Sequence, residues 1–287
     1  MSAADRDDPS RRLDIELVSR GLARSRGQAR ELVGGGAVLV DGRLQTKAAA
    51  HVTSSSLIVL TRTPARWVGR AAAKLHHALE LWGPDGAGPA GADPSRRVLD
   101  PLGRRCLDAG ACTGGFTQVL LAAGAAAVTA LDVGHGQLAA ELAGDPRVTD
   151  LPGTDIRDVT PAELGGVFDL VVADLSFISL RLTLRPLRDL TAADGDLVVL
   201  VKPQFEVGRE RLGRGGVVTS PQEHRRVLRD VHRLATGLDL VVRGAAPSPV
   251  RGVAGNREFL LWLTPRADHG GLGEDDMLER MNLGADT

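Results

Sequence analysis

Apolar and polar residues alternate along this chain with two different periods. Between residues 10 and 62, two stretches place apolar side chains three or four positions apart, the spacing of amphipathic helices. These positions are Leu13, Leu17 and Leu22 in the first stretch and Ala29, Leu32 and Val33 in the second. After them, AVLVDGRLQT alternates around Asp41 and Gly42, which predicts a β-hairpin, and HVTSSSLIVL predicts another strand. The pattern predicts a small α+β domain over residues 11–62.

The rest of the chain has the rhythm of strand, helix and strand. A helix is expected from about Arg70, and a Gly- and Pro-rich loop follows it near residues 83–95, so that residues 63–95 form a connecting segment. From Arg104 onward, apolar runs of strand length alternate with helical stretches. Such alternation predicts an α/β fold over residues 96–266, a Rossmann-like parallel sheet wrapped by helices that binds ligands at the carboxyl ends of its strands.

Charge is distributed unevenly along the chain. The 287 residues carry a net charge of −1, and 43% hydrophobic with 25% charged residues is ordinary for a soluble protein with a core. Between Arg11 and Lys74, however, twelve Lys or Arg stand against four acids, an excess of eight positive charges. Residues 267–287 are acidic and contain Gly, so a disordered tail is expected there.

Cysteine content and hydropathy limit the cellular setting. Cys106 and Cys112 lack a second pair, which fits neither a disulfide framework nor a zinc site, so we expect no metal and a reducing compartment. No run approaches the ~20 apolar residues that span a bilayer, and the N-terminus lacks a signal-peptide pattern. A soluble, cytoplasmic protein that binds no membrane is expected, and we expect it to be a monomer.

The stretch SRGLARSRGQARELVGGGAVLVDGR, within its αα-β pattern, resembles the S4 RNA-binding domain. Guanidinium groups clustered around its second helix can bind phosphates, whereas the alternative interpretation is a solvated charged face. With the resemblance, RNA contact is the stronger hypothesis, and it concerns the shape and backbone of RNA more than its sequence. The expected RNA-binding residues are Arg11, Arg12, Arg20, Arg24, Arg26 and Arg30, together with Arg70 further along the chain.

A glycine-rich turn lies between two predicted strands, in CLDAGACTGGFTQVLL. A Walker A loop requires a lysine that reaches the phosphates, but Phe116 stands at that position, so an ATPase is rejected. A dinucleotide-binding turn requires a glycine where this chain has Cys112, which disfavours NAD. The turn therefore suits a nucleoside cofactor without phosphate groups.

An acid at the end of the next strand narrows the cofactor further. Asp132 lies 22 residues after Gly110, where a carboxylate can accept both hydroxyls of a ribose. S-adenosylmethionine (AdoMet) has a ribose, an adenine and an amino-acid tail but no phosphate, so it is the expected cofactor. The expected cofactor-binding residues are Asp108, Gly110, Cys112, Thr113, Gly114, Gly115, Phe116, Asp132, Val133, Asp155, Ile156 and Asp174.

The order of these features is similar to that of the TlyA family. The resemblance rests on the S4-like module followed by RWVGRAAAKL, LDAGACTGGFTQVLL, ALDVGHGQLA, FDLVVADLSFISL, LVKPQFEVGR and GNREFLLWL, and it covers about residues 11–264. It implies a class I methyltransferase that uses AdoMet to methylate ribose 2′-hydroxyls of ribosomal RNA, on cytidines in both subunits. Ribosomal RNA or ribosomal subunits would then be the partners. Members of this family are often labelled haemolysins.

The resemblance also implies a Lys-Asp-Lys-Glu tetrad, which falls on Lys74, Asp174, Lys202 and Glu258. A ribose 2′-hydroxyl is a poor nucleophile until its proton is removed. A lysine serves as the base only if its pKa falls from about 10.4 toward neutrality, which burial or a second lysine favours. We assign Lys202 as the base, Asp174 and Glu258 as orienting acids, and Lys74 as a cation that positions the substrate.

Each of these residues has a structural alternative. A lysine such as Lys74 on an amphipathic helix is ordinarily solvated, and Lys202 at a strand end can be a surface lysine. Asp174 can cap its strand, and Glu258 can protect an edge strand. Trp67 and Phe177 are either core residues or platforms on which a base stacks. The chain also departs from the family pattern, with Cys112 in place of Ser, Ala71 and Ala72 in place of glycines, and His135 in place of an aromatic residue.

Two other functions compete with methyl transfer. One is a non-catalytic RNA-binding or ribosome-assembly protein, against which the complete tetrad and glycine-rich turn count. The other is a membrane-active haemolysin, against which the lack of a spanning segment or a strongly amphipathic basic helix counts.

Overall fold

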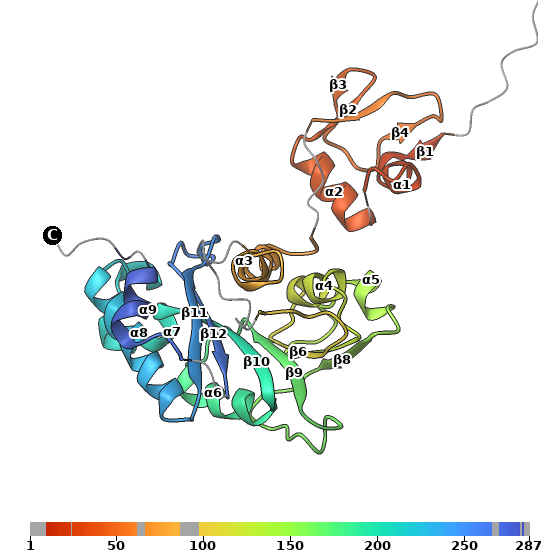
Figure 1. Cartoon of the computed structure of the whole chain (residues 1–287). Helices are drawn as coiled ribbons and strands as arrows, with labels where there is room; N and C mark the ends of the chain where they lie inside the picture. Colours follow the sequence, from red (N-terminus) through yellow and green to blue (C-terminus); the bar gives the residue numbers. More distant parts are fainter. Residues whose placement is uncertain are drawn as a thin grey trace, which may run out of the picture. The chain divides into compact units, whose positions relative to one another are not determined.

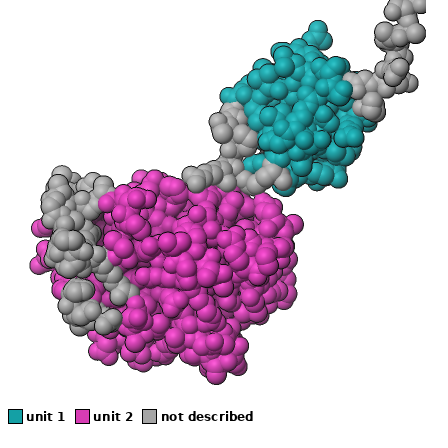
Figure 2. Space-filling view, turned by 45° about the vertical axis from the view of Figure 1, so that its right-hand side comes forward, with its two compact units in different colours: residues 1–66 teal, residues 67–287 magenta. Residues whose placement is uncertain are grey.

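The computed structural model describes residues 10–23, 25–61, 67–86, 98–265, 270–281 and 283. Arg24, much of the expected connecting segment and parts of the acidic tail lie outside these residues. The chain divides into two compact units, residues 1–66 and 67–287, shown in two colours in Figure 2 and with their elements in Figure 1. Each unit has an apolar core of its own.

The first unit consists of two helices and short strands. Its core buries the apolar positions predicted from helical spacing, including Leu13, Leu17, Ala29 and Val33. Asp41 and Gly42 have positive φ values of 50° and 78°, as a two-residue hairpin turn requires. One sheet has the order β3-β2-β5 and another pairs β1 with β4. The elements are β1 Arg11–Arg12, α1 Leu13–Ser19, α2 Arg26–Gly34, β2 Val38–Val40, β3 Arg43–Leu44, β4 His51–Val52 and β5 Ile58–Leu60.

The second unit is built on a seven-stranded sheet of order β11-β12-β10-β9-β6-β7-β8. Strands β8, β7, β6, β9 and β10 run parallel, as the alternating pattern predicts. The sheet is mixed, however, because β12 runs antiparallel to both β10 and β11. No helix among the described residues separates β11 from β12, and strands joined without a crossover pair antiparallel. The strands are β6 Arg105–Ala109, β7 Ala127–Asp132, β8 Val148–Pro152, β9 Phe168–Ala173, β10 Thr191–Val201, β11 Val241–Pro247 and β12 Phe259–Thr264.

Helices cover both faces of this sheet (Figure 1). Helices α3, α4 and α5 contribute buried side chains to the core on one face, and α6, α8 and α9 contribute to the core on the other. The helix predicted inside the connecting segment therefore belongs to the second unit, since Leu75, Ala78 and Trp82 are buried there. The helices are α3 Ala72–Trp82, α4 Gly115–Ala122, α5 Ala140–Ala143, α6 Leu180–Asp189, α7 Pro203–Glu206, α8 Pro221–Thr236 and α9 Glu274–Arg280.

The expectation of a disordered tail over residues 267–287 is wrong where the structure describes it. Helix α9 lies within this tail and buries Met277, Leu278 and Met281 in the core that α8 and β11 share. Glu274 forms ion pairs with two arginines of α8, Arg229 and Arg233. The acidic composition hid an apolar stripe of helical spacing, and tertiary burial of that stripe orders the helix.

Candidate active site

The glycine-rich turn connects β6 to α4 at the carboxyl end of the sheet. Gly110 and Gly114 have positive φ values of 83° and 89°. A Cβ at Gly110 would lie 3.1 Å from the carbonyl oxygen of Asp174, and one at Gly114 would lie 2.7 Å from Leu138 Cδ1. Glycine is thus required at both positions for backbone conformation and for close packing. Cys112 shares the left-handed conformation, with a φ of 48°.

Asp132 at the end of β7 holds this turn from the side. One carboxylate oxygen accepts a hydrogen bond from the Cys112 amide at 2.8 Å, and the other accepts one from the Gly134 amide at 2.7 Å. Each oxygen has a second lone pair, so the carboxylate is oriented by backbone donors while it can still accept hydrogen bonds from a ligand.

Two adjoining cavities open along the carboxyl ends of the strands, with volumes of about 670 and 510 Å³. Both are lined by Gly110, Cys112, Asp174, Ser176 and Phe177. The predicted cofactor residues divide between them. Asp108, Thr113, Gly115 and Phe116 line the larger cavity, and Asp132, Val133, Asp155 and Ile156 line the smaller one. Gly114 lines neither cavity, because it faces the packing of Leu138 and Leu142.

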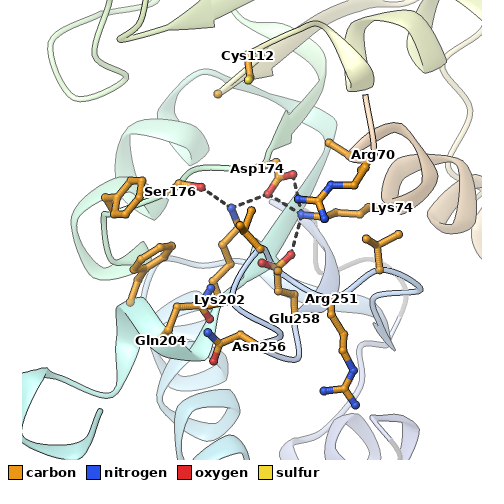
Figure 3. A pocket seen from close by; sticks show the side chains of 18 of the residues that line it. Arg70, Lys74, Cys112, Asp174, Ser176, Lys202, Gln204, Arg251, Asn256 and Glu258 are labelled. Carbon is orange, nitrogen blue, oxygen red and sulfur yellow. Dashed lines mark hydrogen bonds and ion pairs between the residues drawn. The ribbon is translucent and has the colours of Figure 1, made fainter. Parts of the chain in front are cut away.

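The four residues of the expected tetrad meet in the larger cavity (Figure 3). Asp174 follows β9, Lys202 follows β10, Lys74 lies on α3 and Glu258 directly precedes β12. Nζ of Lys202 lies 2.8 Å from Asp174 Oδ1, and Nζ of Lys74 lies 2.9 Å from Asp174 Oδ2. Lys74 Nζ also forms an ion pair with Glu258 Oε2 at 2.6 Å, and Oε2 has no other partner among the described residues.

Burial and charge pairing together set the ionisation of this cluster. Lys74, Lys202 and Glu258 are only 7%, 6% and 4% exposed. Burial alone would lower the pKa of Lys74, but the carboxylates of Asp174 and Glu258 outweigh it and raise that pKa above its ordinary value. Burial likewise opposes ionisation of Asp174, yet Lys202 and Lys74 hold its pKa below the usual range. Lys74 therefore remains a cation and Asp174 an anion.

Ser176 joins the cluster without having been predicted from the sequence. Its Oγ accepts a hydrogen bond from Lys202 Nζ at 2.8 Å. Lys202 is thus oriented by two acceptors that lie two residues apart, Asp174 and Ser176. The motif VADLS contains both residues, but the turn that brings the hydroxyl beside the lysine is a tertiary feature.

The neighbouring aromatic residues differ in exposure. Phe177 is 91% exposed and has a φ of 63°, a conformation that costs a bulky residue on the order of 1–3 kcal/mol. Its ring lies 5.4 Å from that of Phe205 at the edge of the larger cavity. Trp67 is half-buried against His76, with ring centroids 5.5 Å apart. Of the two residues weighed for stacking, Phe177 presents a free face and Trp67 contributes to packing.

Asp108 is completely buried beneath the glycine-rich turn. Its Oδ2 accepts hydrogen bonds from the amide and the hydroxyl of Thr117 at 2.8 and 2.7 Å. Its Oδ1 has no hydrogen-bond partner among the described residues. Burial raises the pKa of Asp108 to about 7, against the lowering effect of the Thr117 hydrogen bonds. A buried carboxylate oxygen without a partner is an unusual and costly feature that calls for a ligand.

Asp155 has a partner of its own in the smaller cavity. Its carboxylate accepts hydrogen bonds from Nε and Nη2 of Arg157 at 3.0 and 2.6 Å, which lowers its pKa. Arg157 also lines this cavity and was not predicted from the sequence. In a bidentate pair of this kind, Asp155 and Arg157 fix each other's position, and the carboxylate of Asp155 is already bound.

The predicted RNA-binding arginines of the first unit have different surroundings. Arg12, Arg26 and Arg30 surround the buried carboxylate of Asp14, at 3.0, 3.0 and 3.5 Å. Their side chains remain 40%, 51% and 58% exposed, so each can bind a phosphate.

Arg20 is occupied within the fold. It donates to the Glu16 carboxylate and to the backbone carbonyls of Thr53, Ser54 and Ser56. These contacts give Arg20 a structural role, and its expected contact with RNA stays a prediction. Arg11 lies in β1, and Arg24 lies outside the described residues.

Both units match known protein families. The FtsJ-like methyltransferase family matches residues 67–264, and the S4 domain matches residues 11–58. The 16S/23S rRNA (cytidine-2′-O)-methyltransferase TlyA of Mycobacterium tuberculosis is 49% identical over 258 residues, which are 90% of this chain and 91% of that protein. The chain belongs to the TlyA family.

Other relatives of this TlyA-family chain carry a different name. Hemolysin A of Brachyspira hyodysenteriae is 30% identical over 254 residues, 87% of this chain and 98% of that protein. The solved structure of a candidate hemolysin from Streptococcus thermophilus is 32% identical, with a TM-score of 0.69 over 95% of this chain and 94% of that one. In the part of the chain that the structure describes, no helix combines the length and apolar character needed to cross a membrane.

The described residues of this TlyA-family chain also contain no group of three or more His, Cys, Asp or Glu side chains arranged to hold a metal ion. Cys106 is buried in the sheet, where burial raises its pKa to about 12, and Cys112 is exposed in the glycine-rich turn.

Proposed function

We propose that this protein transfers the methyl group of AdoMet to the 2′-hydroxyl of a cytidine ribose in ribosomal RNA. The observation that carries the proposal is the buried Lys74–Asp174–Lys202–Glu258 cluster in a cavity that adjoins the glycine-rich turn. The named activity of the M. tuberculosis relative supports the choice of cytidine and of both rRNAs as substrates. The proposal includes action in the cytoplasm, where ribosomal RNA is found, by a single copy of the chain.

The residues of the two cavities fit AdoMet. Asp132 offers two oriented oxygens to the ribose hydroxyls, and the smaller cavity beyond it would hold the adenine between Val133 and Ile156. The unpartnered oxygen of Asp108 fits the ammonium group of the amino-acid tail, which would satisfy a buried acceptor. The bound cofactor supplies a methyl group activated by a sulfonium.

The buried cluster provides groups for the proton that the 2′-hydroxyl must lose. Lys202 reaches the cavity from the end of β10 and would accept this proton as the uncharged amine. Asp174 and Ser176 fix the position of its Nζ. Lys74 remains charged and would orient the ribose oxygen, while Glu258 holds Lys74 in place.

Two features support RNA as the substrate. The first unit carries the exposed arginines Arg12, Arg26 and Arg30, whose guanidinium groups suit phosphates. At the cavity, the exposed ring of Phe177 offers a face on which an unstacked base can lie. The strained backbone of Phe177 is consistent with a functional position, because strain of this kind concentrates at binding sites.

The test is methyl transfer from tritiated AdoMet to separate 30S subunits, 50S subunits and 70S ribosomes, with Lys202→Met as the catalytic control. We expect label in rRNA that nuclease digestion and chromatography identify as 2′-O-methylcytidine. Tight RNA binding without any transfer would instead indicate a non-catalytic RNA-binding protein. Lysis of erythrocytes by the wild type and by Lys202→Met alike, without rRNA methylation, would indicate a haemolysin.

A further inference from the structure

Arg70 occupies a distinctive place beside the glycine-rich turn. A Cβ at the preceding residue, Gly69, would lie 2.6 Å from Oγ1 of Thr113. On the other side of Arg70, the amide nitrogen of Ala72 lies 3.0 Å from the position that a Cβ on Gly115 would take. The backbone of Arg70 is therefore held between two contacts with the turn, and Figure 3 shows its side chain directed into the larger cavity.

The charge of Arg70 is not balanced by the residues around it. Many arginines of this unit, such as Arg104, Arg147 and Arg181, are ion-paired with an acid. Arg70 makes no ion pair with any acid in the described ranges. The carboxylates of Asp174 and Glu258 in the same cavity are bound to the two lysines. An exposed guanidinium without an ion pair among the described residues, at a cavity that also contains Lys74 and Lys202, is suited to bind an anionic ligand.

Asp108, in the same cavity, has one oxygen that lacks a partner of the opposite kind, a hydrogen-bond donor or cation. Its Oδ1 is a buried acceptor that lacks a donor among the residues that the structure places. The lining of one cavity thus contains a carboxylate without a cation and a guanidinium without an anion among the described residues. An α-amino acid group, with one ammonium and one carboxylate on a single carbon, supplies both missing partners. A phosphate or a ribose would supply at most one.

We propose that Arg70 binds the carboxylate of the cofactor's amino-acid tail, while Asp108 binds its ammonium group. This inference rests on the proposed function and revises the expectation that Arg70 contacts RNA. A guanidinium can donate two parallel hydrogen bonds to a carboxylate, which a lysine cannot. The arrangement also explains why the segment before α3 is packed so closely on the turn, because this contact fixes the distance between the two recognition groups.

The experiment pairs a truncated ligand with a truncated side chain. Calorimetry would measure the binding of S-adenosylhomocysteine (AdoHcy) and of its decarboxylated analogue to the full-length wild type and to Arg70→Met. In the wild type, loss of the carboxylate should weaken binding about 10- to 100-fold, the effect of a charge-assisted hydrogen bond. Arg70→Met should weaken AdoHcy binding by a similar factor and leave the affinity for the decarboxylated analogue unchanged. Arg70→Lys should recover only part of the loss.

Arg251→Met is the matched control. Arg251 lines the same cavity, is exposed, and hydrogen-bonds the Gly255 carbonyl. Its replacement should leave both affinities unchanged. If Arg70→Met weakens both ligands equally, or neither, the inference is wrong, and loss of rRNA affinity alone would make Arg70 an RNA contact. Failure of the wild type to bind AdoHcy at all would overturn the proposed function and this inference together, so the two failures are distinguishable.

Discussion

Nζ of Lys202 lies 2.8 Å from Oδ1 of Asp174, and the two side chains are only 7% and 10% exposed. The other oxygen of the same carboxylate binds Lys74. A single acid therefore holds two lysines in a site that excludes most water, where charges interact more strongly than at the surface. Breaking this arrangement leaves uncompensated charge in the site, so its members are expected to act as a unit.

Replacement of Lys202 should abolish chemistry without preventing binding. Lys202→Met is expected to bind AdoHcy and rRNA almost normally but to lose roughly 10²–10⁴-fold in turnover, the usual contribution of a general base. Lys202→Arg should be nearly as inactive, because a guanidinium keeps its proton at any accessible pH. Single-turnover methylation with saturating rRNA separates this chemical defect from a defect in binding. Near-normal activity of Lys202→Arg would show that the lysine is only an electrostatic anchor.

Asp132→Ala should weaken AdoHcy binding by about 2–3 kcal/mol, since it removes a charged acceptor for two ribose hydroxyls. It also removes the hydrogen bonds that orient the amides of Cys112 and Gly134, so the turn should become more mobile. Calorimetry measures the affinity, and hydrogen exchange of the Cys112 amide reports the mobility. Asp150→Ala, at an exposed position of the adjacent strand β8, is the control. An unchanged affinity in folded Asp132→Ala would place the ribose elsewhere.

The raised pKa of Asp108 predicts a pH dependence of cofactor binding. Because burial raises this pKa to about 7, the carboxyl is protonated at lower pH and offers no charge to an ammonium group. AdoHcy affinity should therefore increase as the pH rises toward 7, by up to about tenfold per unit. Above about pH 8 the ligand's own α-amino group loses its proton, so affinity should be greatest between these values.

Calorimetry in buffers of different ionisation enthalpy checks this prediction, because binding near pH 6 should release a proton from Asp108. In Asp108→Asn the dependence around pH 7 should disappear. In the absence of ligand, Asp108 also makes the stability of the fold depend on pH, in the direction opposite to that of ligand affinity. The folded state binds this proton more tightly than the unfolded chain, so stability should fall as the pH rises from about 4 to about 7. A wild-type affinity that is flat from pH 5.5 to 7.5 would contradict an ionisable partner at this position.

The sequence predicts most strongly what local patterns encode. The hairpin at Asp41 and Gly42, the strand–helix alternation and the strand-end position of Asp132 depend on neighbouring residues, and the structure contains all three. The four residues of the tetrad are far apart in the chain, so only the resemblance to a family indicated that they meet. Geometry alone then shows that Asp174 is the member that contacts both lysines.

The features that the sequence analysis did not find have a common physical origin in tertiary contacts. The structural contacts of Arg20 were not predicted, because they include backbone carbonyls 33 to 36 residues away. Ser176 was overlooked because its hydroxyl reaches Lys202 only through the turn in which Phe177 has a positive φ. Helix α9 was missed because its stability depends on burial against α8 and not on its acidic composition. The contacts of Arg20 and Ser176 leave no periodic signal in the sequence, and the apolar stripe of α9 is short and lies among acidic residues.

Substitutions of Arg20 and of Arg26 should therefore have different effects on stability and on rRNA binding. Arg20→Ala removes hydrogen bonds to Glu16 and to the turn after β4, and should destabilise the first unit by about 1–3 kcal/mol. Arg26→Ala should cost less stability, because Arg12 and Arg30 still pair with the buried carboxylate of Asp14. It should instead weaken rRNA binding and reduce the slope of log affinity against log salt by about 0.7–0.9. Hydrogen exchange and filter binding on the full chain measure the two effects. Equal destabilisation by both variants would contradict this separation.

Gly252 offers a way to displace Glu258 without changing its charge. A Cβ at Gly252 would lie 2.7 Å from Oε1 of Glu258, closer than two such atoms can approach. The flexible carboxylate, rather than the backbone, is the group that can yield. In Gly252→Ala we therefore expect Glu258 to move away from Lys74, which would lose one of the two acids that hold it.

The expected result is a fall in single-turnover rate with little change in AdoHcy affinity, because Gly252 lines the larger cavity but not the part that adjoins Asp132. Gly270→Ala is the matched control, since a Cβ there meets nothing within 4 Å. Combining Gly252→Ala with Glu258→Gln tests whether displacement of Glu258 causes the fall in rate. If the alanine acts by displacing the carboxylate, the double variant should be no slower than Glu258→Gln alone, whereas independent defects would multiply. A multiplicative loss would mean that Gly252 is required for the shape of its loop and not for the position of Glu258.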